Sequence, residues 1–325
     1  MPLRDPSKNR GSVRSSLALI ASAGLVAVAL SGCASAPAPE ATAGQSSDAV
    51  VVTGDFGEKP RVKFPDPLTP DETQCTEVIA GDGQRLQEGQ QAMIGLAVYN
   101  GGTGETLQEP SGFGDEDQIP LVVGGTLPGL SKALTCASVG SRVVAVVPPA
   151  DGFGDEGNES LNIAPEDSLV FVMDVQRAFP ARADGAPRLT RDGFPAVVLA
   201  PDGRPGITVP KGDPPKELQT EVLKQGSGET VEDGDSVVVQ YTGVLWDGNT
   251  VFDSSWEKGA PATFVVSASD DSQVIPGFSK AIIGQQVGSQ IGVIVPPSEG
   301  YGDQGNAQVP AGSTLFFVID ILGVI

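Results

Sequence analysis

The residues best suited to chemistry in this sequence are aromatic side chains grouped with a few polar ones in its C-terminal third. They lie in five short fragments: Tyr241-Thr242-Gly243, Phe252-Asp253-Ser254-Ser255, Val274-Ile275-Pro276-Gly277-Phe278, Tyr301-Gly302 and Leu315-Phe316-Phe317-Val318-Ile319-Asp320. Apolar rings combined with two tyrosine hydroxyls and the Asp253 carboxylate predict the lining of a small, water-poor pocket. Such a pocket can favour one conformation of a bound group without forming a covalent bond.

The composition excludes several other kinds of site. The chain contains no histidine, which removes Ser-His-Asp and Cys-His triads, histidine-ligated zinc and imidazole proton shuttles. No cofactor and no metal site is therefore expected. The formal net charge of −21 argues against nucleic acid as a partner and against binding anionic lipid through a basic surface.

The order and spacing of the five fragments resemble the FKBP family, the peptidyl-prolyl cis/trans isomerases that also bind FK506-like macrolides. The resemblance covers residues 216–325 and implies catalysis without covalent chemistry. Rotation about an X–Pro bond has a barrier of about 18–20 kcal/mol, because the planar amide is stabilised by charge-separated resonance. An apolar pocket disfavours that planar form relative to the twisted transition state.

The resemblance also implies a role for each pocket residue. The catalytic contacts that it implies come from Tyr241, Asp253, Ile275 through its backbone N–H, and Tyr301. The walls that it implies for the substrate are Phe252, Phe264, Val274, Phe278, Val309 and Phe317, with Phe278 as the floor under the prolyl ring. The alternative is that the aromatic rings only fill a core, although a core has little use for hydroxyls and a carboxylate unless they are paired.

A second copy of the same unit lies earlier in the chain. Residues 59–65 (KPRVKFP) recur as residues 204–210 (RPGITVP), an offset of 145, and the LPGL of 127–130 corresponds to the IPGF of 275–278. With this offset Tyr241 corresponds to Leu96, and the pair at 252–253 corresponds to Leu107-Gln108. Because the carboxylate is lost, the first copy is expected to be a degenerate FKBP-like domain with little or no activity.

Local patterns in the second copy predict an α+β fold. Residues 237–241, 291–295 and 314–322 are rich in β-branched and aromatic side chains, as strands are. The Asp247-Gly248 pair predicts a tight hairpin, and Pro276 predicts the start of a short helix over 277–284. We therefore expect two FKBP-like domains, each a curled antiparallel sheet wrapped around one short helix.

The N-terminus resembles an export signal. Residues 1–32 combine four basic side chains with the apolar run 17–30, and Leu30-Ser31-Gly32-Cys33 resembles the lipobox of bacterial lipoproteins. This predicts Cys33 as the lipidated first residue of an extracytoplasmic protein that is held at the cell membrane by its lipid anchor alone. The alternative is an ordinary cleaved signal with an incidental cysteine.

Export also bears on the other two cysteines. Cys75 and Cys136 are then the only remaining thiols, and an oxidising compartment predicts a disulfide between them. The alternative is two buried, reduced thiols that act as small hydrophobic side chains.

These observations divide the chain into five parts. They are a signal peptide (1–32), a lipidated flexible tether (33–55), a degenerate FKBP-like domain (56–177), a linker with a pre-domain strand (178–215) and an isomerase domain (216–325). The expected function is isomerisation of prolyl bonds in exported, proline-containing polypeptides, which assists the folding of envelope proteins. The alternative is an extracytoplasmic chaperone or binding module with incidental isomerase activity.

Overall fold

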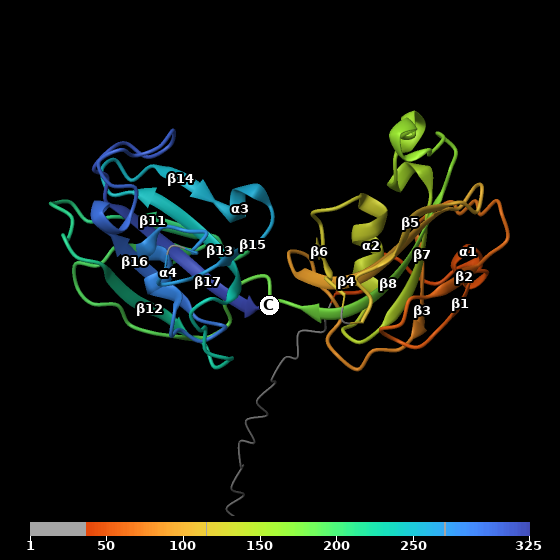
Figure 1. Cartoon of the computed structure of the whole chain (residues 1–325), viewed down its shortest axis with the longest axis horizontal. Helices are drawn as coiled ribbons and strands as arrows, with labels where there is room; N and C mark the ends of the chain where they lie inside the picture. Colours follow the sequence, from red (N-terminus) through yellow and green to blue (C-terminus); the bar gives the residue numbers. More distant parts are fainter. Residues whose placement is uncertain (1–36, 115, 270) are drawn as a thin grey trace, which may run out of the picture. The chain divides into compact units, whose positions relative to one another are not determined.

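The structure is a computed structural model that describes residues 37–114, 116–269 and 271–325. Within these residues there are two antiparallel sheet domains of the same design (Figure 1). The predicted signal peptide and Cys33 lie outside the described residues. No helix among the residues described has the length and apolar character to cross a bilayer.

The first domain is built on a sheet with the strand order β3-β7-β8-β4-β5, to which β6 adds by pairing with β4. Its strands are β3 (Gln74–Ile79), β4 (Gln91–Asn100), β5 (Thr106–Ser111), β6 (Ile119–Val122), β7 (Arg142–Val147) and β8 (Leu169–Ala178). The central strands β7 and β8 carry almost continuous apolar residues because both of their faces are covered.

The second domain repeats this arrangement with the order β14-β13-β17-β16-β12-β9, and β15 pairs with β13. Its strands are β9 (Ala186–Pro187), β12 (Gln219–Gln225), β13 (Ser236–Leu245), β14 (Val251–Ser254), β15 (Ala262–Val265), β16 (Gln290–Val295) and β17 (Leu315–Val324). The predicted Asp-Gly hairpin joins β13 to β14, where Gly248 and Asn249 both have positive φ, as a tight hairpin turn requires.

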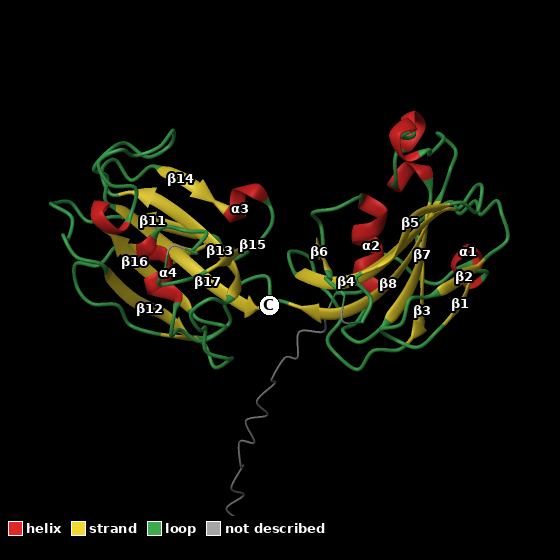
Figure 2. Cartoon of the chain, in the orientation of Figure 1, coloured by secondary structure: helices red, strands yellow, loops and turns green. Residues whose placement is uncertain are grey.

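One short helix packs on the inner face of each sheet, as the α+β prediction required (Figure 2). The helices are α2 (Pro128–Cys136) and α4 (Pro276–Ile282), and each has proline at its first position, where a missing N–H costs nothing. In the second domain Phe278 and Ile282 of α4 pack against Val293 of β16 and Phe317 of β17.

Two hairpins cover the outer faces of the sheets. Because of these hairpins, the domain boundaries in the structure differ from those expected from the sequence. Strand β1 (Val51–Thr53) pairs with β2 (Arg61–Lys63) and packs on the first sheet, and residue Thr42 forms a bridge with Gln74. Residues 42–53 therefore belong to the first domain rather than to a flexible tether. The reason is that Val50 and Val52 bury their side chains against the sheet.

The segment expected as a linker is likewise part of the second domain. Strand β10 (Ala196–Leu199) pairs with β11 (Pro205–Thr208), and Phe194, Val197 and Ile207 pack on the outer face of the second sheet. Upstream, β9 pairs with β12, and the Ala183 backbone N–H donates to the Asp320 carboxylate at 2.8 Å. The linker expected over 178–215 therefore ends by residue 183.

Two features tie the first domain together. Cys75 in β3 and Cys136 at the end of α2 are joined by a disulfide. On the outer face, the buried Arg142 guanidinium pairs with the buried Asp174 carboxylate and also donates to the carbonyls of Gly54 and Glu58. This ion pair holds the turn between β1 and β2 against the sheet.

Candidate functional site

The aromatic residues predicted for the pocket meet in one cavity of about 580 Å³ in the second domain. Phe278 from α4 lies at its centre, with ring centroids 5.9 Å from Tyr241, 6.0 Å from Phe264 and 5.4 Å from Phe317. The rings meet edge to face, the geometry that their quadrupoles favour. Phe252 closes the set by packing on Phe317 at 5.5 Å. These rings form the walls and floor of an apolar cavity.

Nine of the ten residues predicted from the sequence line this cavity. They are Tyr241, Phe252, Asp253, Phe264, Val274, Ile275, Phe278, Tyr301 and Phe317. Val309 is not among the lining residues, since its side chain is only 1% exposed and packs in the core of the domain. Its backbone N–H donates to the Asn306 side chain at 2.8 Å, so Val309 anchors the loop that carries Tyr301.

A hydrogen-bonded polar pair lies at the edge of the aromatic cavity. The Tyr241 hydroxyl donates to the Asp253 carboxylate at 2.6 Å, and the Lys258 ammonium contacts the same carboxylate at 2.5 Å. Burial alone would raise the pKa of Asp253, but the hydrogen bonds from Lys258 and Tyr241 outweigh it and lower that pKa below its usual value. Asp253 is therefore a carboxylate at neutral pH and accepts hydrogen bonds only.

The two tyrosines remain protonated at the same pH. Burial, followed by the hydrogen bond to Asp253, raises the pKa of Tyr241. Burial and then the Asp253 charge raise the pKa of Tyr301, with a smaller opposing effect from Asn306. The Tyr241 hydroxyl uses its proton in the hydrogen bond to Asp253, whereas the Tyr301 hydroxyl keeps its proton for donation to a bound peptide.

The start of α4 provides a further donor. Among the described residues, no group accepts a hydrogen bond from the Ile275 backbone N–H, which lies at the N-cap of the helix. Ser272 holds the preceding backbone: its hydroxyl donates to the Val274 carbonyl at 3.0 Å and bonds to the Ser279 hydroxyl at 2.7 Å. The Ile275 N–H is thus presented by a fixed turn.

Sequence reasoning missed four residues that line the cavity: Lys258, Ala262, Ser272 and Gln273. Lys258 had a usable signal, since it is the only basic residue in 225–279 and follows Asp253 by five positions. Ser272 and Gln273 had no such signal in the sequence, because their roles depend on contacts that only the folded loop creates.

Gly243 is a further determinant of the cavity. It lies opposite Asp253 on β14 and opposite Phe317 on β17. A Cβ atom at this position would lie 2.7 Å from the rings of both Phe252 and Phe317, closer than real contacts allow. The aromatic walls can therefore approach the strand only because residue 243 has no side chain.

The first domain has the same pocket in a reduced form, with a volume of about 180 Å³. The register of β4 places Val98 opposite Gln108 and Phe171, where Gly243 stands in the second domain. Leu96 stands where the second domain has Tyr241, as the repeat predicted. Tyr99 does not replace it, because its ring packs on Phe64 on the outer face of the sheet.

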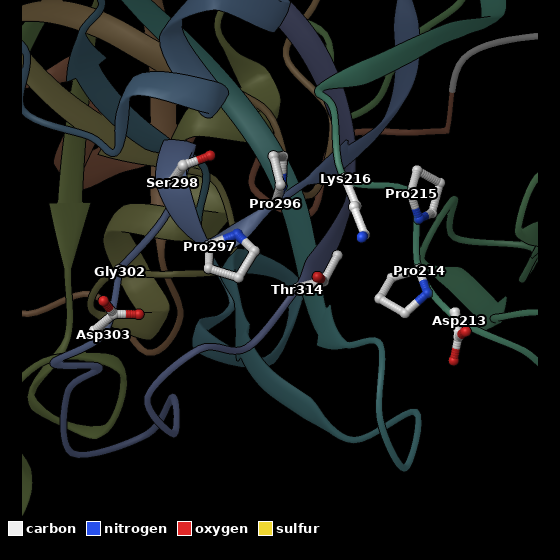
Figure 3. A pocket seen from close by; sticks show the side chains of 10 residues that line it. All are labelled: Asp213, Pro214, Pro215, Lys216, Pro296, Pro297, Ser298, Gly302, Asp303 and Thr314. Carbon is white, nitrogen blue, oxygen red and sulfur yellow. The ribbon is translucent and has the colours of Figure 1, made fainter.

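The second domain has another cavity, which is larger than the aromatic cavity but chemically different from it. It has a volume of about 610 Å³, and Figure 3 shows Pro214 and Pro215 on one side of it and Pro297 and Ser298 on the other. It contains no aromatic ring and no hydroxyl paired with a carboxylate. The aromatic cavity, rather than this groove, is therefore the candidate site. In the described part of the chain no cluster of three potential metal-ligating side chains is present.

Comparison with known proteins identifies the repeated unit. The family described as FKBP-type peptidyl-prolyl cis-trans isomerase matches residues 84–176 and 227–322. An FK506-binding protein of Streptomyces anulatus is 34% identical over 123 residues, which are 37% of this chain and 97% of that protein. A probable FK506-binding protein of Corynebacterium glutamicum is 32% identical over 119 residues, 37% of this chain and 97% of that one.

A third relative has a similar level of identity. The FKBP-type peptidyl-prolyl cis-trans isomerase FkpA of Aeromonas hydrophila is 39% identical over 107 residues, which are 33% of this chain and 38% of that protein. The matches thus cover nearly all of the two actinobacterial proteins but under half of the third.

Proposed function

Because the chain belongs to the FKBP-type peptidyl-prolyl cis-trans isomerase family and is such an enzyme, we propose that its catalysis takes place in the second domain, in the aromatic cavity. The observation that supports this is the pair formed by Tyr241 and Asp253 at 2.6 Å beside an apolar floor. In the first domain leucine and glutamine stand at the corresponding positions, and no carboxylate lines the smaller cavity.

The aromatic walls act on the electronic structure of the substrate amide. A planar X–Pro amide has separated charge that water stabilises, and the twisted transition state loses that separation. Transfer of the amide onto Phe278 and its neighbouring rings removes the water, so the planar form is disfavoured relative to the twisted one. A thousandfold to millionfold acceleration requires only about 4–8 kcal/mol of this differential stabilisation.

The polar groups orient the peptide while its bond rotates. The Ile275 N–H and the Tyr301 hydroxyl donate to carbonyl groups of the bound chain, which holds one side of the X–Pro bond fixed. The Asp253 carboxylate fixes the Tyr241 ring and sets the electrostatic field at the side of the cavity where the amide twists. No proton leaves the substrate, so none of these groups has to act as an acid or base.

Substitutions at the matched positions of the two domains test this assignment. Asp253→Leu and Tyr301→Phe in the full chain should each lower kcat/KM for a Leu-Pro peptide in a protease-coupled assay. Gln108→Leu changes the matched position of the first domain and should have no effect on that rate. Equal losses from Gln108→Leu and Asp253→Leu would place catalysis in both domains and contradict the proposal.

The substrates that we propose are proline-containing exported polypeptides, and the location is the outer side of the cell membrane. Support comes from the sequence Leu30-Ser31-Gly32-Cys33 after an apolar segment, which is typical of a lipidation signal. Beyond residue 32 the chain has a net charge of −24, so an acyl chain rather than a basic surface would provide the anchor. Cys33→Ser should move the protein from the membrane fraction to the soluble fraction. Unchanged sedimentation with membranes would exclude Cys33 as the anchor.

The alternative, a binding module with incidental isomerase activity, is favoured by one observation, the apolar cavity that the first domain keeps. The two functions are compatible, since the second domain can turn over prolyl bonds in chains that the first one holds.

A further inference from the structure

The cavity of the first domain has kept its apolar lining although it has lost the polar groups of the second. Leu96, Val98, Leu107, Leu127 and Phe171 form its walls, and Gln108 is its one amide side chain. Its volume of about 180 Å³ is well below the roughly 300–1,000 Å³ of sites that take drug-sized ligands. A single aliphatic side chain fits a hollow of this size, whereas a macrolide does not.

One large apolar side chain at this cavity is exposed to solvent. Leu161, in the short helix η3 (Glu159–Leu161), lines the cavity and is 49% exposed, while its neighbour Ile163 is buried. The helix is held in place by Asn158, whose side chain accepts a hydrogen bond from the Leu161 N–H. The cavity thus has an apolar side chain at its mouth that is continuous with its apolar lining and in contact with water.

The segments that build this cavity are strongly acidic. Residues 96–111 and 149–171 contain eight Asp and Glu residues and no Lys or Arg. Of these, only Asp151 forms an ion pair with another described residue, through Lys132. Glu105 lies at the rim, where its carboxylate accepts a hydrogen bond from Asn162 at 3.0 Å, and Glu159 is in the same helix as Leu161.

The second domain has fewer such carboxylates. Its corresponding segments, residues 241–256 and 297–317, contain four acidic residues: Asp247, Asp253, Glu299 and Asp303. Two of the four are in ion pairs, Asp253 with Lys258 at the mouth of the cavity and Glu299 with Lys280 at 2.8 Å. The excess of unpaired carboxylates is therefore larger at the first cavity than at the second.

We propose that the first domain is a peptide-binding site without isomerase activity, which takes an aliphatic side chain flanked by Lys or Arg in an extended polypeptide. The hollow accepts the aliphatic group, and the unpaired carboxylates around it attract the flanking cations and select against acidic segments. Recognition requires no proline, so this site widens the range of chains that the protein can hold.

A peptide without proline tests the site separately from catalysis. The probe is a fluorescein-labelled peptide with one leucine between lysines, titrated with the full chain and followed by fluorescence anisotropy. Replacement of its leucine by serine should weaken binding about tenfold or more, since most of the burial is lost. Replacement of its lysines by glutamate should abolish binding, and added salt should weaken binding of the original peptide. Equal affinity for all three peptides would overturn the proposal.

Substitutions in the protein locate the binding. Leu161→Ser should weaken binding of the lysine-leucine peptide about tenfold, whereas Leu189→Ser, at a leucine that is 99% exposed and outside the cavity, should have no effect. Glu159→Gln should reduce both the affinity and its salt dependence. Isomerase activity should be unchanged in these variants. If Asp253→Leu weakens peptide binding and Leu161→Ser does not, the peptide occupies the second cavity and the proposal is wrong.

Discussion

The open volume of the aromatic cavity depends on the absence of a side chain at Gly243, and Gly243→Ala tests this dependence. A Cβ at residue 243 would lie 2.7 Å from the Phe252 and Phe317 rings, about 1 Å inside ordinary van der Waals contact. The rings lie in the walls that should hold the proline, so they can relieve the clash only by moving into the cavity. The first domain shows the related arrangement, with Val98 at this register and a cavity of about 180 Å³ instead of about 580 Å³.

The expected loss follows from the burial that the substrate would forfeit. Full burial of an apolar side chain contributes about 1.5–3 kcal/mol, and at about 1.36 kcal/mol per decade the loss of this contribution lowers kcat/KM about 10- to 150-fold. Overpacking of a core by one methyl group costs about 1–3 kcal/mol of stability, which a folded domain tolerates. Gly243→Ala should therefore remain folded while it loses most of its activity.

The assay is protease-coupled isomerisation of a Leu-Pro peptide by the full chain, with circular dichroism and thermal melting to verify the fold. Val98→Ala is the matched control, because it changes the corresponding position of the first domain and should leave kcat/KM as in the wild type. Wild-type kcat/KM in a folded Gly243→Ala variant would refute the reasoning, since the ring positions would then not determine catalysis.

The remaining predictions concern charge and stability. Between about pH 5 and pH 9 kcat/KM should be constant, because the pKa of Asp253 is lowered and activity is lost only as the pH falls through that pKa. Lys258→Met removes a hydrogen bond that lowers the pKa of Asp253. In this variant the loss of activity on acidification, the acid limb of the pH profile, should therefore move to higher pH. Identical acid limbs in the two proteins would argue against a role for the carboxylate. Arg142→Met leaves a buried carboxylate unpaired and should destabilise the first domain by about 3–5 kcal/mol in thermal melts, with isomerase activity retained. Cys75 and Cys136 are 61 residues apart, and the entropy of closing a loop of this length corresponds to about 4 kcal/mol of stability. Reduction of their disulfide should therefore destabilise the first domain by about this amount and leave the second domain unaffected. Equal shifts in both melting transitions would contradict this.

The sequence predicted the core elements of the second domain well because their signals are local. The strand expected over 237–241 extends over Ser236–Leu245, and the helix expected over 277–284 spans Pro276–Ile282. Proline at a helix start and an Asp-Gly turn act through the backbone of one or two residues, so they need no tertiary information.

The outer hairpins were not recognised, since their stability comes from packing rather than from propensity. Strands β1, β2, β10 and β11 have only three or four residues each, and glycine and proline are frequent in the segments around them. This composition led to the assignment of β1 to a tether and of β10 and β11 to a linker. Their recurrence at an offset of 145 was the available signal, because a solvated linker has no reason to repeat. Val309 was assigned to the pocket by resemblance alone, and its burial depends on the loop around Asn306.

The two domains together show that this fold and its chemistry are specified by different residues. Both sheets have the same strand pairing, and in both the helix begins at a proline and packs on apolar residues of the central strands. Those contacts are present with either Leu96 or Tyr241 at the pocket strand, so neither side chain is needed for folding. In the proposed assignment, catalysis depends instead on three neighbouring positions, at which a tyrosine, a glycine and an aspartate in one domain are replaced by a leucine, a valine and a glutamine in the other. Because these positions lie at the edge of the core, the proposal predicts that a repeat can exchange isomerisation for binding without a change of fold.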